Sequence, residues 1–207
     1  MANADRPNGF KPVKHLSGAP YNGQANKYMI SASDSTAAVG VGDFVVLSDQ
    51  AGTDGLAAVE SITAGAVTAA VLVGSVVAVL PFNDDGSMQA GQISSLDTPV
   101  YRADDTKRFV LVADAPDLVF EAQEDSDGGN IALASVGLNC GFLAASPSST
   151  TGTSAQEIDS SSVQTTNSLP LQILGVVQRP DNEVPAANGR FHVRINTHAY
   201  HGTVTAV

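Results

Sequence analysis

Three groups of side chains in this sequence are candidates for metal binding or catalysis: histidines near the end of the chain, one cysteine and one acidic run. His198 and His201 are three residues apart. In a helix, a spacing of three would place both side chains on one face, where they could bind a metal. In a turn, the same spacing does not indicate a metal site. His192 falls on the polar side of an alternating segment. We therefore expect these histidines to be solvated or to lie at an interface, and we expect no metal site.

Cys140 is the single cysteine, so the sequence offers it no partner for an intrachain disulfide. It stands in the apolar stretch LNCGF, with no histidine within fifty residues. This context favours a buried small hydrophobic residue over a nucleophile. The chain also lacks a Gly-x-Ser-x-Gly nucleophile elbow and a glycine-rich phosphate loop. The sequence thus predicts a protein that is not an enzyme and that holds no cofactor.

The acidic run DSDGGN over residues 125–130 resembles the start of a calcium-binding loop. Such a loop needs glycine at its sixth position and glutamate at its twelfth. This sequence has Asn130 and Val136 at those positions. Because both differ, a hairpin turn rich in Asp and Gly explains the run more simply, and we expect no calcium.

The candidate groups lie in or beside short apolar runs bounded by turn residues, and such runs are typical of strands. The clearest is 190–197, where Phe191 and Val193 fall on one face and His192 and Arg194 on the other. This alternation predicts a half-buried strand. We expect at most a short helix or two among the strands. The predicted strands are 42–48, 56–62, 71–80, 98–102, 107–113, 117–124, 131–135, 171–178 and 190–197.

The composition agrees with an all-β fold. The chain has 207 residues, of which 43% are hydrophobic and 15% are charged, so it is too apolar for a wholly disordered protein. It contains 24 Val and 7 Ile against 14 Leu, together with 19 Gly and 10 Pro. This balance favours strands and turns over helices.

The most hydrophobic stretch, 67–82, is broken by Gly74 and Ser75 and is too short to span a bilayer, so we expect no membrane contact.

The charge is unevenly distributed along the chain. Ten Lys and Arg against 21 Asp and Glu give 10 − 21 = −11, which disfavours nucleic acid as a partner. Residues 1–27 alone carry four basic groups against Asp5, or +3, and the remainder carries 6 − 20 = −14. The sequence therefore predicts a basic N-terminal arm on an acidic body.

The predicted arm covers residues 1–35, and the β-rich body covers 36–207. Frequent Pro and Gly residues break both helix and central strand, so we expect the arm to be extended and irregular. An arm of this kind is either disordered or ordered against a partner by its apolar side chains.

Within the body, 13 of the 23 residues over 146–168 are Ser or Thr. We expect this segment to be a long solvated loop, either mobile or held by a neighbouring subunit.

Several strings of the sequence resemble a family of tailed-bacteriophage virion structural proteins. They are DRPNGFKPV and GAPY within 5–21, FVLVADAPDLVFEAQED over 109–125, LPLQILG and QRPDNE within 169–183, and VRINTH over 193–198. Members of this family look like capsid decoration, or cement, proteins, which bind the outside of the icosahedral shell and reinforce it. The resemblance implies a location on the outer surface of the capsid in the virion, with the major capsid protein as partner and a homotrimer as the assembly.

Together, the sequence and the resemblance predict an all-β barrel or sandwich, jelly-roll-like, with an extended N-terminal arm and long polar loops. The residues that we expect to dock on the capsid are Arg6, Phe10, Lys11, Val13, Lys14, Tyr21 and Lys27. A tail-associated or head-fibre subunit is an alternative from the same resemblance. A carbohydrate-binding β-sandwich module, or a small hydrolase, for host adsorption is an alternative of another class. Because the chain has no Trp and 4 Tyr, it has few aromatic platforms for sugars.

Overall fold

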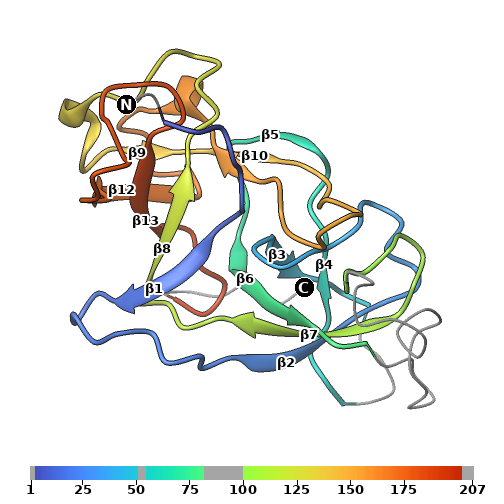
Figure 1. Cartoon of the computed structure of the whole chain (residues 1–207). Coiled ribbons are helices and arrows are strands. Elements are labelled where there is room, and N and C mark those ends of the chain that lie inside the picture. Colours follow the sequence, from blue (N-terminus) through green and yellow to red (C-terminus); the bar gives the residue numbers. More distant parts are fainter. Residues whose placement is uncertain (1–2, 51–54, 82–99, 202–207) are drawn as a thin grey trace.

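In the described part of the chain, nearly all of the regular structure is antiparallel β-sheet, which confirms the predicted all-β class. The computed structural model describes residues 3–50, 55–81 and 100–201. Within these ranges the strands form two five-stranded sheets and one three-stranded sheet. In Figure 1 the two larger sheets lie side by side, and the small sheet crosses the top of the molecule between them. The arrangement is a curled half-barrel, consistent with a barrel or sandwich body.

The first sheet has the strand order β1-β8-β13-β12-β9, so it joins the N-terminal, central and C-terminal parts of the chain. On β13, Phe191 and Val193 are buried while His192 and Arg194 are partly exposed, which confirms the predicted half-buried strand. The strands of this sheet are β1 (Lys11–His15), β8 (Leu118–Gln123), β13 (Arg190–Ile195), β12 (Leu171–Val176) and β9 (Asn139–Cys140).

The second five-stranded sheet has the order β2-β7-β6-β3-β4, and the small sheet has the order β11-β10-β5. The strands of the second sheet are β2 (Asn26–Ile30), β7 (Arg108–Ala113), β6 (Leu72–Val79), β3 (Phe44–Leu47) and β4 (Val59–Glu60). The small sheet consists of β11 (Glu157–Ile158), β10 (Phe142–Ala144) and β5 (Gly65–Val67). Two 3-10 helices in the described ranges are η1 (Leu133–Ser135) and η2 (Ser160–Ser162).

Two hydrophobic clusters fill the interior. The larger one lies against the inner face of the first sheet and has a centre of aromatic side chains. The smaller one is mostly Val and belongs to the second sheet. Strand β6 serves both, because Leu72 joins the larger cluster while Val73 and Val76 join the smaller one. The fully buried aromatic side chains of the larger cluster are Phe10, Phe44, Phe142 and Phe191, and Phe120 lies beside them at 1% exposure.

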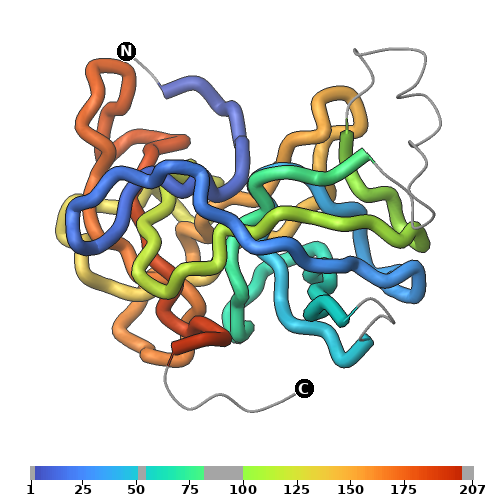
Figure 2. Tube along the Cα trace, turned by 90° about the horizontal axis from the view of Figure 1, so that it is seen from below, coloured from blue at the N-terminus to red at the C-terminus, as the bar shows by residue number. Residues whose placement is uncertain are grey.

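The N-terminal segment is part of the folded body, which corrects the prediction of a separate arm over 1–35. β1 pairs with β8, β2 pairs with β7, and the Phe10 side chain is fully buried. Gly9 allows this entry into the core, because its φ is +63° and a Cβ there would collide with the Gly42 carbonyl and the Ser154 side chain. Pro12 is tolerated because β1 is an edge strand. Figure 2 shows this blue segment running along the body instead of away from it.

Most other strand predictions are confirmed, with short changes at the ends. The observed strands β3, β4, β6, β7, β8, β12 and β13 all lie within predicted segments. Of the predicted strand 98–102, residues 98 and 99 lie outside the described ranges, and residues 100–102 form no strand but only an isolated bridge from Arg102 to Val39. The predicted strand 131–135 is wrong, because this segment contains η1. Only Ile131 enters the core there, while Leu133 is 58% exposed and the Ser135 amide closes a turn onto the Ala132 carbonyl.

The Ser/Thr-rich segment 146–168 is held by its own chain, which corrects the prediction of a wholly solvated loop. Ile158 is fully buried and lies on β11, which pairs with β10. The Ser160 amide and hydroxyl both donate to Asp125 Oδ1, at 3.1 and 2.8 Å. Two apolar side chains on the larger core, Ile158 and Val163, and short side-chain hydrogen bonds therefore hold this segment against its own chain.

Candidate functional site

The outer face of the first sheet gathers basic side chains from distant parts of the chain. In the strand register, Lys14 of β1 and Arg194 of β13 both lie opposite Val119 of β8. Lys11 of β1 and His192 of β13 likewise both lie opposite Glu121 of β8. Directly paired residues point to the same face of a sheet. The pairing of three strands therefore places these side chains on one surface.

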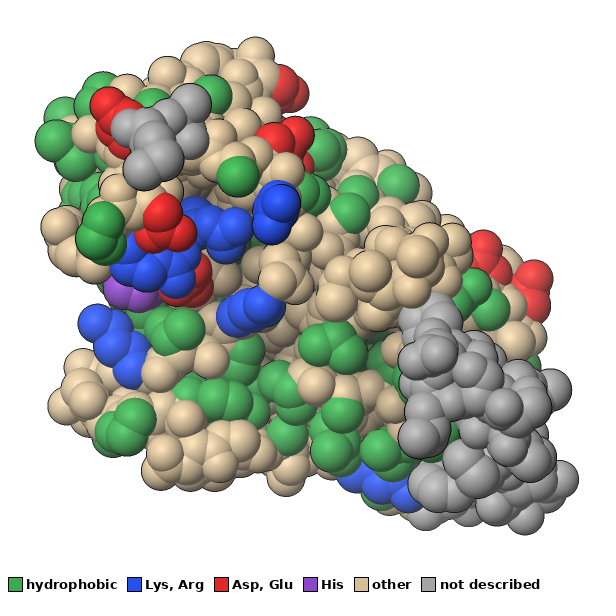
Figure 3. Space-filling model, viewed as in Figure 1, with side chains coloured by type: hydrophobic (Ala, Val, Ile, Leu, Met, Phe, Trp, Pro, Cys, Tyr) green, Lys and Arg blue, Asp and Glu red, His purple; other side chains and the backbone are tan. Residues whose placement is uncertain are grey.

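Three further arginines extend this surface. Arg190 lies opposite Gln123, and Arg179 forms an ion pair with Glu121 at 2.8 Å. Arg6 and Arg190 line one hollow of this surface, and the Arg6 carbonyl accepts a hydrogen bond from Arg190 Nη2 at 3.3 Å. Figure 3 shows the resulting group of Lys and Arg side chains on one side of the molecule. We call this surface the basic face and define it by Arg6, Lys11, Lys14, Arg179, Arg190, His192 and Arg194.

The basic face holds six of the ten Lys and Arg residues of the chain. The other four are in different environments. Arg102 and Arg108 are buried, at 0% and 8% exposure. Lys27 and Lys107 both lie over the ring of Phe109 in the second sheet, at 4.1 and 5.7 Å from its centroid. A protein with a net charge of −11 thus presents one concentrated basic surface.

Hydrogen bonds and ion pairs hold the arginines of the basic face in place. Glu121 Oε1 lies 2.8 Å from Arg179 Nη2 and 3.7 Å from Arg190 Nη1. Arg194 Nε donates to Gln172 Oε1 at 2.8 Å. Surface pairs of this kind add little to stability. They do reduce the side-chain freedom that a binding partner would otherwise have to restrict.

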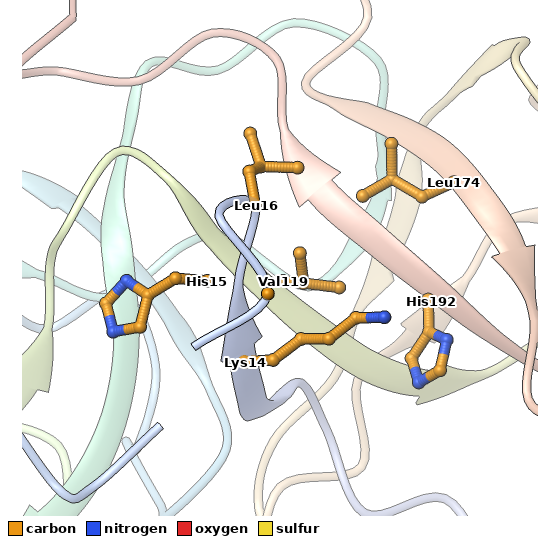
Figure 4. Close-up of a pocket in the computed structure, with 7 residues that line it drawn as sticks. Lys14, His15, Leu16, Val119, Leu174 and His192 are labelled. Carbon is orange, nitrogen blue, oxygen red and sulfur yellow. The ribbon is translucent and has the colours of Figure 1, made fainter. Parts of the chain in front are cut away.

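A pocket of about 160 Å³ opens on the basic face. Figure 4 shows the Lys14 side chain extended across it toward His192. Leu16, Val119 and Leu174 provide its apolar wall. Burial, followed by the nearby Lys14 cation, lowers the pKa of His192. The imidazole is therefore neutral at pH 7, and Lys14 supplies the charge of the pocket.

The structure brings together only part of the predicted docking set. Arg6, Lys11 and Lys14 lie on the basic face, as described above. Phe10 is a core residue, so its side chain is not presented to a partner. Lys27 lies on the other five-stranded sheet.

The two remaining members of the predicted docking set are partly buried. Val13 is a residue of edge strand β1. Tyr21 packs against the larger core, and its hydroxyl donates to the Gln24 carbonyl at 3.0 Å.

Sequence reasoning missed the arginines that complete the basic face. Arg190 and Arg194 lie on the polar side of a strand that was predicted correctly, and Arg179 lies just after β12. The alternation of 190–197 marks these two β13 side chains as outward-facing. It does not show that β1 would be on the same face, because that depends on the strand order.

The remaining candidate groups stay apart from the basic face. His198 is buried, and its Nδ1 accepts a hydrogen bond from the Tyr200 amide, while His201 is exposed. Cys140 is fully buried, and burial raises the pKa of its thiol to about 12. Its behaviour as a small hydrophobic residue is thereby confirmed.

An acidic group forms where the 125–130 run meets the Ser/Thr-rich segment. Carboxylate oxygens of Asp125, Asp127 and Asp159 all lie within 4.8 Å of one another. Serine donors already engage two of these carboxylates, since Asp125 Oδ1 accepts from Ser160 and Asp159 Oδ1 accepts from Ser161. The group therefore orders the contact between two loops.

Among the described residues, no helical segment has the length and hydropathy to cross a bilayer. Comparison of the chain with protein-family models, curated proteins and solved structures gives no match.

Proposed function

We propose that this protein is a non-enzymatic decoration protein of a tailed-bacteriophage capsid, which binds the outer surface of the shell and stabilises it. The observation that carries the proposal is the basic face, which gathers six of the ten Lys and Arg residues on an otherwise acidic all-β body. The strings of sequence that resemble virion structural proteins support the same role. The partner is the major capsid protein, and copies of this chain act as a homotrimer.

The proposed stabilisation follows from mass action. A protein that binds the assembled shell but not its free subunits shifts the equilibrium toward the assembled state. Each contact can be weak, because a symmetric oligomer on a lattice axis engages several sites at once. The ordered arginines of the basic face provide charge-assisted hydrogen bonds to carboxylates on the shell.

The distribution of charge also sets the orientation of docking. Complementary potentials steer association and suppress wrong orientations. The basic face, at the outer side of β1, β8 and β13, meets the shell. The acidic remainder of the surface faces solvent. Because exposed charges are screened by salt, occupancy falls as ionic strength rises.

The test is binding of purified protein to phage heads that lack it, measured by cosedimentation. Deletion of residues 1–27 is a poor variant, because it removes β1 and the buried Phe10. Charge-reversal variants test the docking surface more specifically than this deletion. Lys11→Glu combined with Lys14→Glu should weaken binding about tenfold or more. Lys27 is also exposed but lies on the second sheet, so Lys27→Glu should change binding less than about twofold.

Two outcomes contradict the proposal in different ways. If the wild-type protein does not bind heads, the decoration role fails. If the double variant binds as well as wild type, docking occurs on another surface. Electron microscopy of virions with labelled protein separates a shell location from the tail-associated or head-fibre alternative.

A further inference from the structure

We propose that the pocket on the basic face binds an acidic segment of the shell, with an aliphatic side chain held between Leu16, Val119 and Leu174 and the adjacent carboxylate on Lys14 Nζ. This inference rests on the proposed function, because it names the chemistry that the docking surface recognises.

The apolar wall sets the size of the group that enters. The pocket, of about 160 Å³, has room for a small aliphatic side chain. Leu16 is 47% exposed although it is a large aliphatic residue. Covering this surface removes apolar area from water, which favours binding of an aliphatic side chain.

The polar wall sets the charge of the group. Lys14 extends over the pocket beside the neutral ring of His192 (Figure 4). None of the described residues that line the pocket is acidic. His15 points away, and its Nδ1 lies 3.1 Å from Asp117 Oδ1. A ligand carboxylate is therefore the natural partner of the Lys14 ammonium group.

The surroundings favour a protein segment over a larger anion. Arg194 follows Lys14 and Val119 across the sheet, so a chain leaving the pocket along this row meets a second cation. The Arg194 side chain is already oriented by Gln172. An extended acidic segment matches this row, with one aliphatic residue in the pocket and carboxylates on either side of it.

The first test uses a probe that has only the two proposed features. N-acetyl-L-leucine carries one isobutyl group and one carboxylate, and its control, N-acetyl-L-leucinamide, lacks the charge. Titration of the full chain, followed by NMR, should perturb signals of Val119, Leu174 and His192, with a Kd on the order of millimolar for so small a ligand. The acid should bind more tightly than the amide.

Two variants separate the two walls. Lys14→Met keeps the alkyl chain but removes the charge, so the acid and the amide should bind equally. Leu174→Asn should weaken both ligands. Because both side chains are partly or fully exposed, the variants should fold, and thermal melting checks this. The absence of perturbation in the wild type, or an unchanged preference in Lys14→Met, overturns the inference.

The second test uses heads that lack the protein. Leu174→Asp should reduce head occupancy about tenfold, whereas Lys27→Glu should not. If Leu174→Asp binds heads as wild type does, the pocket is not used and the inference fails while the decoration role stands. If wild type does not bind heads at all, the proposed function fails. If the substitution instead changes the sedimentation of the free protein, a second copy occupies the pocket, which also overturns the inference.

Discussion

The ring of Phe10 stacks on the ring of Phe44, with centroids 4.1 Å apart and planes inclined by 23°. Phe10 also meets Phe142 edge to face, at 5.7 Å and 81°. The residue therefore joins the N-terminal segment to the centre of the larger core. The next residues, Lys11 to His15, form a strand instead of a free arm, so the cations of β1 are displayed from a fixed position.

Replacement of Phe10 by Ala should destabilise the fold strongly. Removing a fully buried aromatic ring leaves a cavity, and the expected loss in the free energy of unfolding is about 3–5 kcal/mol. Urea unfolding measures it. Phe109→Ala is the matched control, because Phe109 is only partly buried on the second sheet and should cost less. A loss for Phe10→Ala no larger than that of the control contradicts the assignment of Phe10 to the core.

Arg102 should be essential for stability, although it is charged. Its side chain is fully buried, with Nη1 3.2 Å from Asp34 Oδ2 and with Nε donating to the Thr106 carbonyl. Arg102→Met leaves the buried Asp34 carboxylate with its Ser61 and Thr36 hydrogen bonds but without its cation, which should cost about 3–5 kcal/mol. The double variant with Asp34→Asn should lose less than the sum of the two single variants in urea unfolding. Additive losses would show that the pair is not coupled.

Asp43 should make stability depend on pH. Burial raises the pKa of this carboxyl from 3.8 to about 7 in the folded state. Between these two values the folded chain binds more protons than the unfolded chain, so the contribution of Asp43 is fully present below about pH 4 and is lost as pH rises through about 7.

The slope expected from Asp43 is at most about 1.4 kcal/mol per pH unit. Burial also raises the pKa of Glu157 to about 7, so both groups titrate over the same range. The difference between wild type and Asp43→Asn, measured by urea unfolding from pH 4 to 8, isolates Asp43. Parallel curves for the two proteins would contradict its titration.

Cys140 should be unreactive in the folded protein. The pKa of the thiol is raised to about 12, so almost no thiolate forms at pH 8, and the sulfur is fully buried, so a reagent cannot reach it. A coloured disulfide reagent should modify it only after denaturant unfolds the chain. Fast modification of the native protein would show that this part of the core opens easily.

A strand of this fold was predictable where the alternation of apolar and polar residues within the strand itself marks it. The alternation of Phe191, Val193 and Ile195 predicts β13 from its own residues. Strand β10 gives no such signal, because its three residues become a strand only through pairing with β5 and β11. Phe10 is one apolar residue among Pro, Gly and Lys, so no periodicity indicates that it is buried.

The basic face was predictable only in part, for a related reason. Lys11 and Lys14 are visible as local positive charge. Their neighbours Arg190 and Arg194 lie far away in the sequence. They join the two lysines only because β1 and β13 both pair with β8, and no local pattern reveals that strand order. Lys27 is close to Lys14 in sequence, yet it lies on the second sheet because the chain crosses to that sheet before β2.

The orientation of this protein on the particle decides whether the basic face is the docking surface. A cryo-electron microscopy map of phage heads decorated with the wild-type chain would show which surface meets the shell. Our account predicts that the outer face of β1, β8 and β13, with Lys11, Lys14 and Arg194, contacts the capsid. A map in which that face points to solvent, or heads that carry no density for the protein, would contradict it.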